Sequence, residues 1–360
     1  MKIIHVLAGK IWGGAEIYAT TLGREQRRLG HQVSFYACDV PIVRQSMPSD
    51  IVPHYIDFKG AFDSVSANIL SEDLSKMGKE DVLHVHGTNF VYWAMLAKKK
   101  ANSDVKIILT RHTSRATFIS PLFWRSFRNL HKIIFVSDLS RKKWLSVNFW
   151  MKKSKCVSIL NSVAEVEDTL DAKDSIRKRF IIPENVPVLV FIGRLVTYKG
   201  CEVILKALGE LKDQNFAFVF VGQGKEEYVS KLKSIAEELK ISDKVYFYGY
   251  SNDTKSIILE SDFGVVPSII REGCHLVPME FMKYGKTVIA TNNGAQPEFV
   301  QNNKTGLLIS PDNVIELTSA ISLLLDKKSF REEIEKNAKE YFDNNLTYSK
   351  FLQEIMNSYQ

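Results

Sequence analysis

The chain has 360 residues, of which 45% are hydrophobic and 25% charged, and its formal net charge is +7. This composition is that of a globular protein and excludes disordered and collagen-like chains, while the length predicts two domains. The sequence contains no run of 18 apolar residues, so we expect no transmembrane helix.

Short β-rich runs alternate with longer amphipathic segments along the chain, which is typical of parallel sheets covered by helices. The first series of predicted strands is Ile3–Ala8, Val33–Ala37, Val82–Val85, Lys106–Thr110 and Lys132–Val136, ending near Val157–Leu160. The second series is Val188–Ile192, Ala217–Val221, Val245–Tyr248, Phe263–Pro267, Thr287–Ala290 and Gly306–Leu308. The predicted fold class is α/β, with two Rossmann-like doubly wound domains whose strand ends face one cleft.

Four segments follow from this pattern. Residues 1–163 form the first predicted domain and residues 187–340 the second. Residues 164–186 between them show no strand pattern, change from acidic to basic and contain Pro183 near their end, as an interdomain linker does. Residues 341–360 are helical and polar, and we expect them to pack back on the first domain.

Basic residues are concentrated in the first half of the chain. Residues 98–155 contain 15 Lys and Arg but only two acidic residues, with bulky aromatic residues between them. This combination favours an anionic membrane surface over nucleic acid as a partner, although a solvated basic face over core aromatics would look the same. Within 121–130, Phe123, Phe127 and Leu130 form one apolar stripe of a predicted helix, which faces either lipid or the sheet.

Two segments of the second half carry groups suited to a phosphorylated ligand. Gly193 follows a predicted strand, and Arg194 and Lys199 lie in the loop before the next helix, where their charges and the helix N-terminus favour an anion. This loop matches neither the Walker A pattern nor GxGxxG, which argues against a P-loop NTPase or a nicotinamide enzyme.

The second of these segments follows the predicted strand 263–267. Glu272 and Glu280 are spaced to contact different parts of one extended ligand and do not form an acid–base pair. The backbone N–H groups of Cys274, His275 and Leu276 lie between them, at the predicted start of a helix, where they suit a phosphate. A diphosphate flanked by a sugar and a ribose describes a nucleotide sugar.

The sequence resembles the retaining GT-B glycosyltransferases, specifically family 4, the glycosyl transferases group 1. The matching segments are GGAE at 13–16, DVLHVHG at 81–87, His112 after KIILT, VSDLSR at 136–141, GRLVTYKG at 193–200, VGQG at 221–224, SIIREGCHLVPME at 268–280 and GAQPEFV at 294–300. The chain departs from the family pattern at Gly273-Cys274-His275, where Gly-aromatic-Gly is common, and this leaves the identity of the donor open.

The resemblance implies that the first domain binds an acceptor and the second a nucleoside-diphosphate sugar. It implies that Arg194 and Lys199 neutralise the diphosphate, Glu272 holds sugar hydroxyls, Glu280 holds the ribose, and His112 approaches the transferred sugar. The other residues expected at the substrates are Gly13, Gly14, His86, Gly193, Tyr250, Gly273, Cys274, His275 and Leu276. The resemblance further implies retention of configuration without a metal or other cofactor, and the sequence lacks a DxD pair suited to Mg²⁺.

We therefore predict a retaining, metal-independent glycosyltransferase that moves a sugar, with a UDP-sugar favoured, to a glycan or lipid-linked acceptor in bacterial polysaccharide or lipopolysaccharide assembly. Four widely spaced cysteines favour a reducing, cytoplasmic location, peripheral at the inner membrane face. A nucleotide-sugar epimerase of the same fold and a catalytically silent carbohydrate-binding relative are the alternatives. A metal hydrolase would instead use His84, His86 and His112 as ligands.

Overall fold

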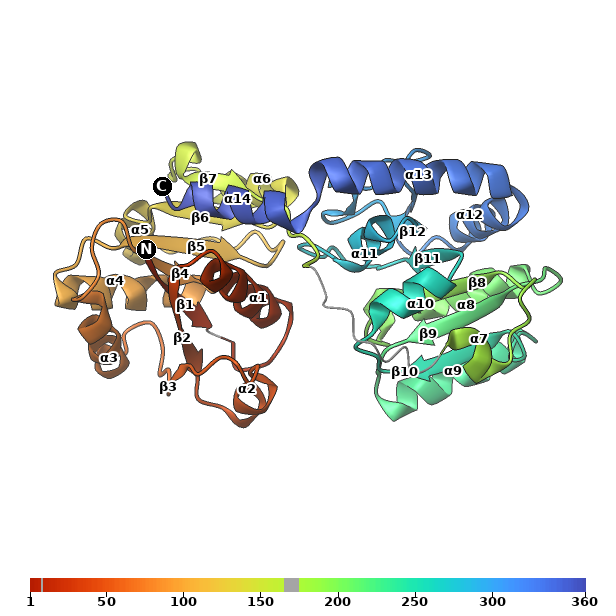
Figure 1. The fold of residues 1–360 in the computed structure, drawn as a ribbon, viewed down its shortest axis with the longest axis horizontal. Coiled ribbons are helices and arrows are strands. Elements are labelled where there is room, and N and C mark those ends of the chain that lie inside the picture. The colour runs from red at the N-terminus through yellow and green to blue at the C-terminus, as the bar shows by residue number, and fades with distance from the viewer. Residues whose placement is uncertain (8, 165–174) are drawn as a thin grey trace. The chain divides into compact units, whose positions relative to one another are not determined.

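The computed structural model describes residues 1–7, 9–164 and 175–360, and these residues form two compact units. The first unit comprises Met1–Leu160 and Ser349–Gln360, and the second comprises Asn161–Tyr348. Each unit contains a parallel sheet with helices packed on it (Figure 1). The predicted linker at 164–186 lies partly outside the described residues, and its described end includes helix α7 (Ile176–Phe180) of the second unit.

The first sheet has seven strands in the order β3-β2-β1-β4-β5-β6-β7, and every neighbouring pair is parallel. The strands are β1 (Lys2–Leu7), β2 (Gln32–Cys38), β3 (His54–Ile56), β4 (Val82–Val85), β5 (Lys106–Arg111), β6 (Lys132–Phe135) and β7 (Cys156–Ser158). The strand order reverses between β1 and β4, and doubly wound sheets bind their ligands at such a point.

Helices cover both faces of this sheet. They are α1 (Gly14–Arg28), α2 (Pro41–Ser46), α3 (Ser64–Leu74), α4 (Val91–Ala101), α5 (Pro121–Arg128), α6 (Asp138–Val147) and α14 (Tyr348–Ser358), with 3-10 turns η1 (Thr88–Phe90) and η2 (Lys153–Lys155). One face packs against α3 to α6 in a core that includes the fully buried Trp93 and Trp144. The opposite face contacts α1 and α14, where the C-terminal Tyr359 is buried.

The second sheet has six parallel strands in the order β10-β9-β8-β11-β12-β13. The strands are β8 (Val188–Ile192), β9 (Ala217–Val221), β10 (Val245–Gly249), β11 (Phe263–Val266), β12 (Thr287–Thr291) and β13 (Leu307–Ile309). The other helices of this unit are η3 (Thr197–Lys199), α8 (Cys201–Glu210), α9 (Glu226–Glu238), α10 (Thr254–Glu260), α11 (Val277–Lys283), η4 (Gln296–Glu298), α12 (Val314–Asp326) and α13 (Lys328–Asn345). Here the order reverses between β8 and β11, the strands followed by the two predicted phosphate-binding segments.

The structure differs from the sequence prediction in three places. The short strand β3 was not predicted, because its three residues are too few to show an alternating pattern. The second unit extends beyond residue 340 to Tyr348, because α13 continues without a break to Asn345. The membrane interpretation of the apolar stripe is wrong, since Phe127 and Leu130 are buried and Phe123 packs against the same core.

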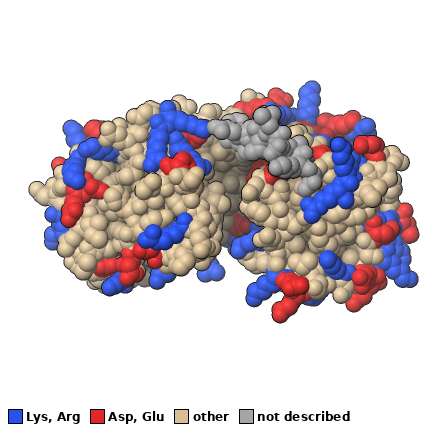
Figure 2. Space-filling model, turned by 60° about the horizontal axis from the view of Figure 1, so that its bottom comes forward, with Lys and Arg blue, Asp and Glu red and all other residues tan. Residues whose placement is uncertain are grey.

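Charged groups on the face drawn in Figure 2 are mixed in sign, with basic and acidic side chains interspersed on each unit.

Within the described residues, no helix is both long enough and apolar enough to span a bilayer.

Candidate functional site

The loop after β8 is held close to the end of β11 by a glycine. The chain leaves β8 through Gly193, forms the turn η3, and enters α8 after Gly200. Gly200 has φ +81°, and a Cβ added there would lie 2.2 Å from the carbonyl oxygen of Pro267. Only glycine tolerates this conformation and this approach together. The loops that carry Lys199 and Glu272 are thereby packed against each other at the point where the strand order reverses.

Lys199 and Glu272 form a closely bonded ion pair. The Nζ of Lys199 lies 2.9 Å and 2.7 Å from the two carboxylate oxygens of Glu272. Ser268 Oγ donates to the same carboxylate at 2.6 Å, and the ring nitrogen Nε2 of His275 lies 3.3 Å from Lys199 Nζ. The side chain of Lys199 is only 8% exposed and that of Glu272 is 22% exposed. Three residues predicted for the site, Lys199, Glu272 and His275, are therefore in direct contact.

These contacts determine the charge and protonation of the group. Burial acts to raise the pKa of Glu272, but the electrostatic effects of His275 and Lys199 and the hydrogen bonds from Lys199 and Ser268 outweigh it, so this pKa lies below its usual value. Burial lowers the pKa of His275 to about 4, so the ring is neutral at pH 7. Because an ammonium group only donates, His275 Nε2 accepts from Lys199 and the ring proton is on Nδ1. That Nδ1–H is buried and has no hydrogen-bond partner among the described residues, and Nδ1 lies 3.8 Å from Glu272 Oε1, too far for a hydrogen bond.

The segment between the two glutamates enters α11 as predicted, with Pro278 in the first turn. Gly273, Cys274 and Leu276 precede this helix and are partly exposed. Burial of the thiol raises the pKa of Cys274 to about 12, so this cysteine is protonated and unreactive at neutral pH.

Glu280 lies on α11 and points into a buried environment. Burial raises the pKa of its carboxyl group, and the atom Oε2 has no hydrogen-bond partner among the described residues. Such an atom is costly to leave unpaired, which suggests that a ligand hydroxyl completes its hydrogen bonding. Among the described residues, no hydrogen bond or ion pair joins Glu280 to Lys199 or Glu272.

Two other predicted residues lie outside the contact group. Arg194 is exposed and donates a hydrogen bond to the hydroxyl of Tyr198 on the same loop. Tyr250 follows the edge strand β10, is 63% exposed, and donates to Asn252 Oδ1 at 2.5 Å.

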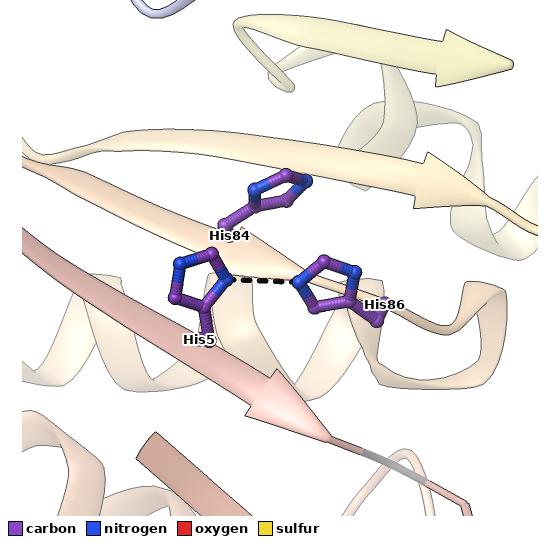
Figure 3. A group of neighbouring side chains, drawn as sticks. All are labelled: His5, His84 and His86. Carbon is purple, nitrogen blue, oxygen red and sulfur yellow. Dashed lines mark hydrogen bonds between the residues drawn. The ribbon is translucent and has the colours of Figure 1, made fainter. Parts of the chain in front are cut away.

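In the first unit, buried histidines meet where the strand order reverses. His5 on β1 and His84 on β4 are fully buried, and His86 follows β4 (Figure 3). His5 Nδ1 lies 2.9 Å from His86 Nε2, and His86 Nδ1 lies 3.2 Å from His112 Nε2. The structure therefore joins the predicted residues His86 and His112 through a hydrogen bond.

The nitrogen atoms of His5, His84 and His86 come within 4.8 Å of one another, close enough to suggest a metal site. However, both nitrogens of each ring already have partners. His5 also bonds Gln26, and His84 bonds the hydroxyls of Tyr359 and Thr110. A metal would have to displace these bonds, so the geometry favours a hydrogen-bonded network over a metal site.

The predicted glycines Gly13 and Gly14 lie at the start of α1. Gly13 N–H donates to the carboxylate of Glu16 at 3.0 Å, and burial raises the pKa of Glu16. A Cβ on Gly9 would lie 2.1 Å from Glu16 Oε1, so this loop folds tightly around the carboxylate. The glycines shape the loop that follows β1.

A cavity of about 460 Å³ lies beyond the ends of β4 and β5. Aromatic side chains line it together with hydroxyl and amide groups. These residues are Thr88, Asn89, Tyr92, Thr117, Phe118, Ser120, Phe123 and Phe127. Rings that stack on sugars, beside groups that hydrogen-bond to hydroxyls, suit a carbohydrate.

Sequence reasoning missed several of these residues. Ser268 directly follows Pro267, the last residue of the predicted strand. Only this position after a strand indicates that Ser268 could belong to the site. Gln26 and His5 lie inside ordinary helix and strand patterns, so nothing in the sequence indicates that they contact His86. The cavity residues come from three separate segments, 60–61, 88–92 and 117–127, and only the fold brings them together.

Comparison with known proteins identifies the family. The family described as "Glycosyl transferases group 1" matches residues 172–341, and "Glycosyltransferase Family 4" matches residues 12–164. The chain belongs to the group 1 glycosyltransferases with the GT-B fold. The N-acetyl-alpha-D-glucosaminyl L-malate synthase of Bacillus anthracis is 24% identical over 89% of this chain and 86% of its own length.

Solved structures agree with this group 1 glycosyltransferase in fold. A glycosyltransferase from Rickettsia africae has a TM-score of 0.85 at 23% identity, covering 99% of this chain and 97% of the other. Anabaena HepE in complex with UDP has a TM-score of 0.83 at 18% identity, covering 99% of both chains. The predicted fold class and family are thus confirmed.

Proposed function

We propose that this glycosyltransferase moves a sugar from a UDP-sugar to a glycan or lipid-linked acceptor, with retention of configuration and without a metal. The observation that carries the proposal is the buried Lys199–Glu272–His275 group at the ends of β8 and β11. It combines a cation and an imidazole N–H, which can bind phosphate oxygens, with a carboxylate, which can accept from sugar hydroxyls.

Each group has a separate task in this proposal. Lys199 and the exposed Arg194 stabilise the negative charge that develops on the leaving diphosphate, which is the work a metal does in other transferases. Glu272 accepts hydrogen bonds from sugar hydroxyls, and His275 Nδ1–H donates to an oxygen of the same ligand. Glu280, with its unpartnered buried oxygen, accepts from the ribose hydroxyls. The UDP complex of Anabaena HepE supports the choice of uracil as the base of the donor.

The acceptor is assigned to the first unit. Its cavity of about 460 Å³ at the ends of β4 and β5 presents aromatic rings and hydroxyls to a sugar. The expectation that His112 meets the transferred sugar remains a prediction. Bacterial surface-glycan assembly is the setting that we propose, because its acceptors are glycans or lipid-linked sugars.

A thermal-shift screen tests donor and metal together. UDP-, GDP- and ADP-sugars are added in the presence of EDTA, and we expect the UDP-sugar to raise the melting temperature most, because a ligand stabilises the state that binds it. Transferase activity should also survive EDTA. Stabilisation that appears only after Mg²⁺ or Mn²⁺ is added would contradict metal independence, and a larger shift with a GDP-sugar would change the donor.

The proposed membrane contact involves exposed residues and not the buried stripe. Phe118 and Leu122 are 55% and 68% exposed, and the exposed Arg115 and Arg125 are close to them in the sequence. Apolar side chains beside cations suit the headgroup layer of an anionic bilayer.

We expect the protein to co-sediment with vesicles containing anionic phosphatidylglycerol and not with neutral vesicles, and the binding to weaken in high salt. Replacement of both Phe118 and Leu122 by serine should reduce the bound fraction several-fold. Ile181→Ser in the second unit, where Ile181 is 89% exposed, is the control that should bind normally. Equal sedimentation of all three proteins would exclude this surface, and no binding at low salt would favour an acceptor in solution.

A further inference from the structure

A layer of hydrogen-bonded side chains lies between the first sheet and the helices α1 and α14. At its centre, the amide of Gln26 bonds His5 Nε2 at 2.7 Å and the hydroxyl of Tyr359 at 3.0 Å. Gln26 is fully buried, as is His5. Figure 3 shows the His5 ring pointing toward His86 from the neighbouring strand.

The orientation of the Gln26 amide follows from a third neighbour. Its nitrogen lies 3.7 Å from the sulfur of Met356 on α14. A thioether only accepts, so the NH₂ group faces Met356 and Tyr359, and the amide oxygen faces His5. The oxygen must then receive a proton from His5, which places the proton of that ring on Nε2.

The tautomer of each histidine ring determines the tautomer of the next ring in the network. A neutral imidazole has one N–H donor and one acceptor nitrogen. His5 Nδ1 therefore accepts from His86 Nε2–H, and His86 Nδ1 in turn accepts from His112 Nε2–H. His112 is left with a lone pair on Nδ1, for which no hydrogen bond occurs among the described residues.

A branch of the same network has the same polarity. The Tyr359 hydroxyl accepts from Gln26, and we infer that it gives its single proton to His84 Nδ1, 2.6 Å away; His84 then carries its proton on Nε2 and donates to Thr110 at 2.7 Å. Burial supports neutral rings throughout, since it lowers the pKa of His5 and of His112 to about 4 and those of His84 and His86 well below their usual value.

We propose that Gln26 is a positioning residue that fixes His112 in the Nε2–H tautomer, so that Nδ1 of His112 presents a lone pair to the ligand. A lone pair accepts from a sugar hydroxyl but has nothing to donate to a phosphate oxygen. The network thus selects a carbohydrate hydroxyl at this position and disfavours an anion. Where it concerns the reaction, this inference rests on the proposed function.

Nitrogen NMR of the ¹⁵N-histidine-labelled full chain tests the tautomers directly, because the two ring nitrogens of a neutral imidazole differ strongly in chemical shift. We expect His5, His84, His86 and His112 all to be Nε2–H at pH 7.5. If the amide of Gln26 were reversed, all four would be Nδ1–H. That result would overturn the proposal, as would a charged or mixed His112. Added Zn²⁺ should leave the spectrum unchanged, whereas loss of these signals would show a metal site instead.

Three variants separate the two branches. Gln26→Met removes the amide that orients both branches, the one through His5 and the one through Tyr359. His112 should then become a mixture of tautomers. Tyr359→Phe is the matched control, since it removes a hydroxyl from the same layer but leaves His112 as Nε2–H. Where its buried carboxyl group is ionised, Gln26→Glu accepts on both oxygens, so it should keep His112 as Nε2–H and change only His84 to Nδ1–H. An unchanged His112 in a folded Gln26→Met protein would contradict the inference.

Activity gives an independent readout. We expect Gln26→Met to lower kcat by roughly tenfold or more, the scale on which outer hydrogen-bond partners act on functional histidines, with little change in KM for the nucleotide sugar. Tyr359→Phe should change neither parameter by as much. If the tautomers behave as expected but His112→Ala has normal turnover, the proposed role of His112 in the reaction fails and the network assignment stands.

Discussion

Replacement of Lys199 by alanine is expected to lower kcat/KM by about 30- to 1,000-fold, corresponding to about 2 to 4 kcal/mol of transition-state stabilisation. Lys199 is the buried cation of the proposed donor site, and because its side chain is only 8% exposed, solvent cannot supply the lost positive charge. Its loss also leaves the Glu272 carboxylate buried without its ionic partner, and this should lower the free energy of unfolding. Steady-state kinetics and urea unfolding measure the two effects separately.

The controls for this prediction separate charge from stability. Lys231→Ala breaks an exposed ion pair of the same type, in which Lys231 Nζ lies 2.9 Å from Glu202, and should leave turnover unchanged. Combining Lys199→Ala with Glu272→Gln should recover much of the stability, because no buried charge is left unpaired, but none of the activity. Near-normal turnover of Lys199→Ala would remove this residue from the donor site.

Replacement of Gly294 by alanine is expected to reduce kcat/KM by about 10²-fold, a loss typical of a misplacement by about 1 Å at a site. Gly294 has φ +58°, and a Cβ there would lie 2.6 Å from the carbonyl oxygen and 2.9 Å from the nitrogen of Glu272. The loop that carries the carboxylate must therefore move. The left-handed conformation itself costs alanine about 1 to 2 kcal/mol, which urea unfolding will also detect.

Gly285 provides the matched control for Gly294. It has φ +70°, but a Cβ there would meet nothing within 4 Å. Gly285→Ala should thus show a similar loss of stability from the backbone conformation while retaining normal kinetics. If the two alanine variants lose activity equally, strain and not displacement of Glu272 explains the effect of Gly294→Ala.

The sequence predicts most of the strands because parallel strands buried on both faces are continuous apolar runs. Val188–Ile192 and Ala217–Val221 were predicted with their observed bounds for this reason. The strand His54–Ile56 lacks such a run. Phe127 and Leu130 illustrate a different limit, because the same helical stripe serves a protein core or a lipid surface, and only the packed structure distinguishes them.

The candidate site was predictable to the extent that its residues follow strand ends. Lys199 and Glu272 lie after adjacent strands of one sheet, so their contact follows from the strand order. The sequence also predicted that Arg194 lies in the loop after β8. It did not indicate that the side chain is exposed and bonds Tyr198 on the same loop. Gln26 and Tyr359, 333 positions apart in the chain, have no sequence signal for their hydrogen bond, because each lies in an ordinary amphipathic helix or just beyond one.

The placement of residues 349–360 in the first unit has a consequence for synthesis on the ribosome. The layer containing His5, His84 and Gln26 is covered in part by Tyr359, which is translated after the whole second unit. During translation, the polar network of the first unit therefore stays uncovered on one side until Tyr359 has been synthesised. All segments of the second unit have been synthesised before that point. We expect the second unit to reach its final protease resistance first on stalled ribosomes, reversing the order of the two units in the chain.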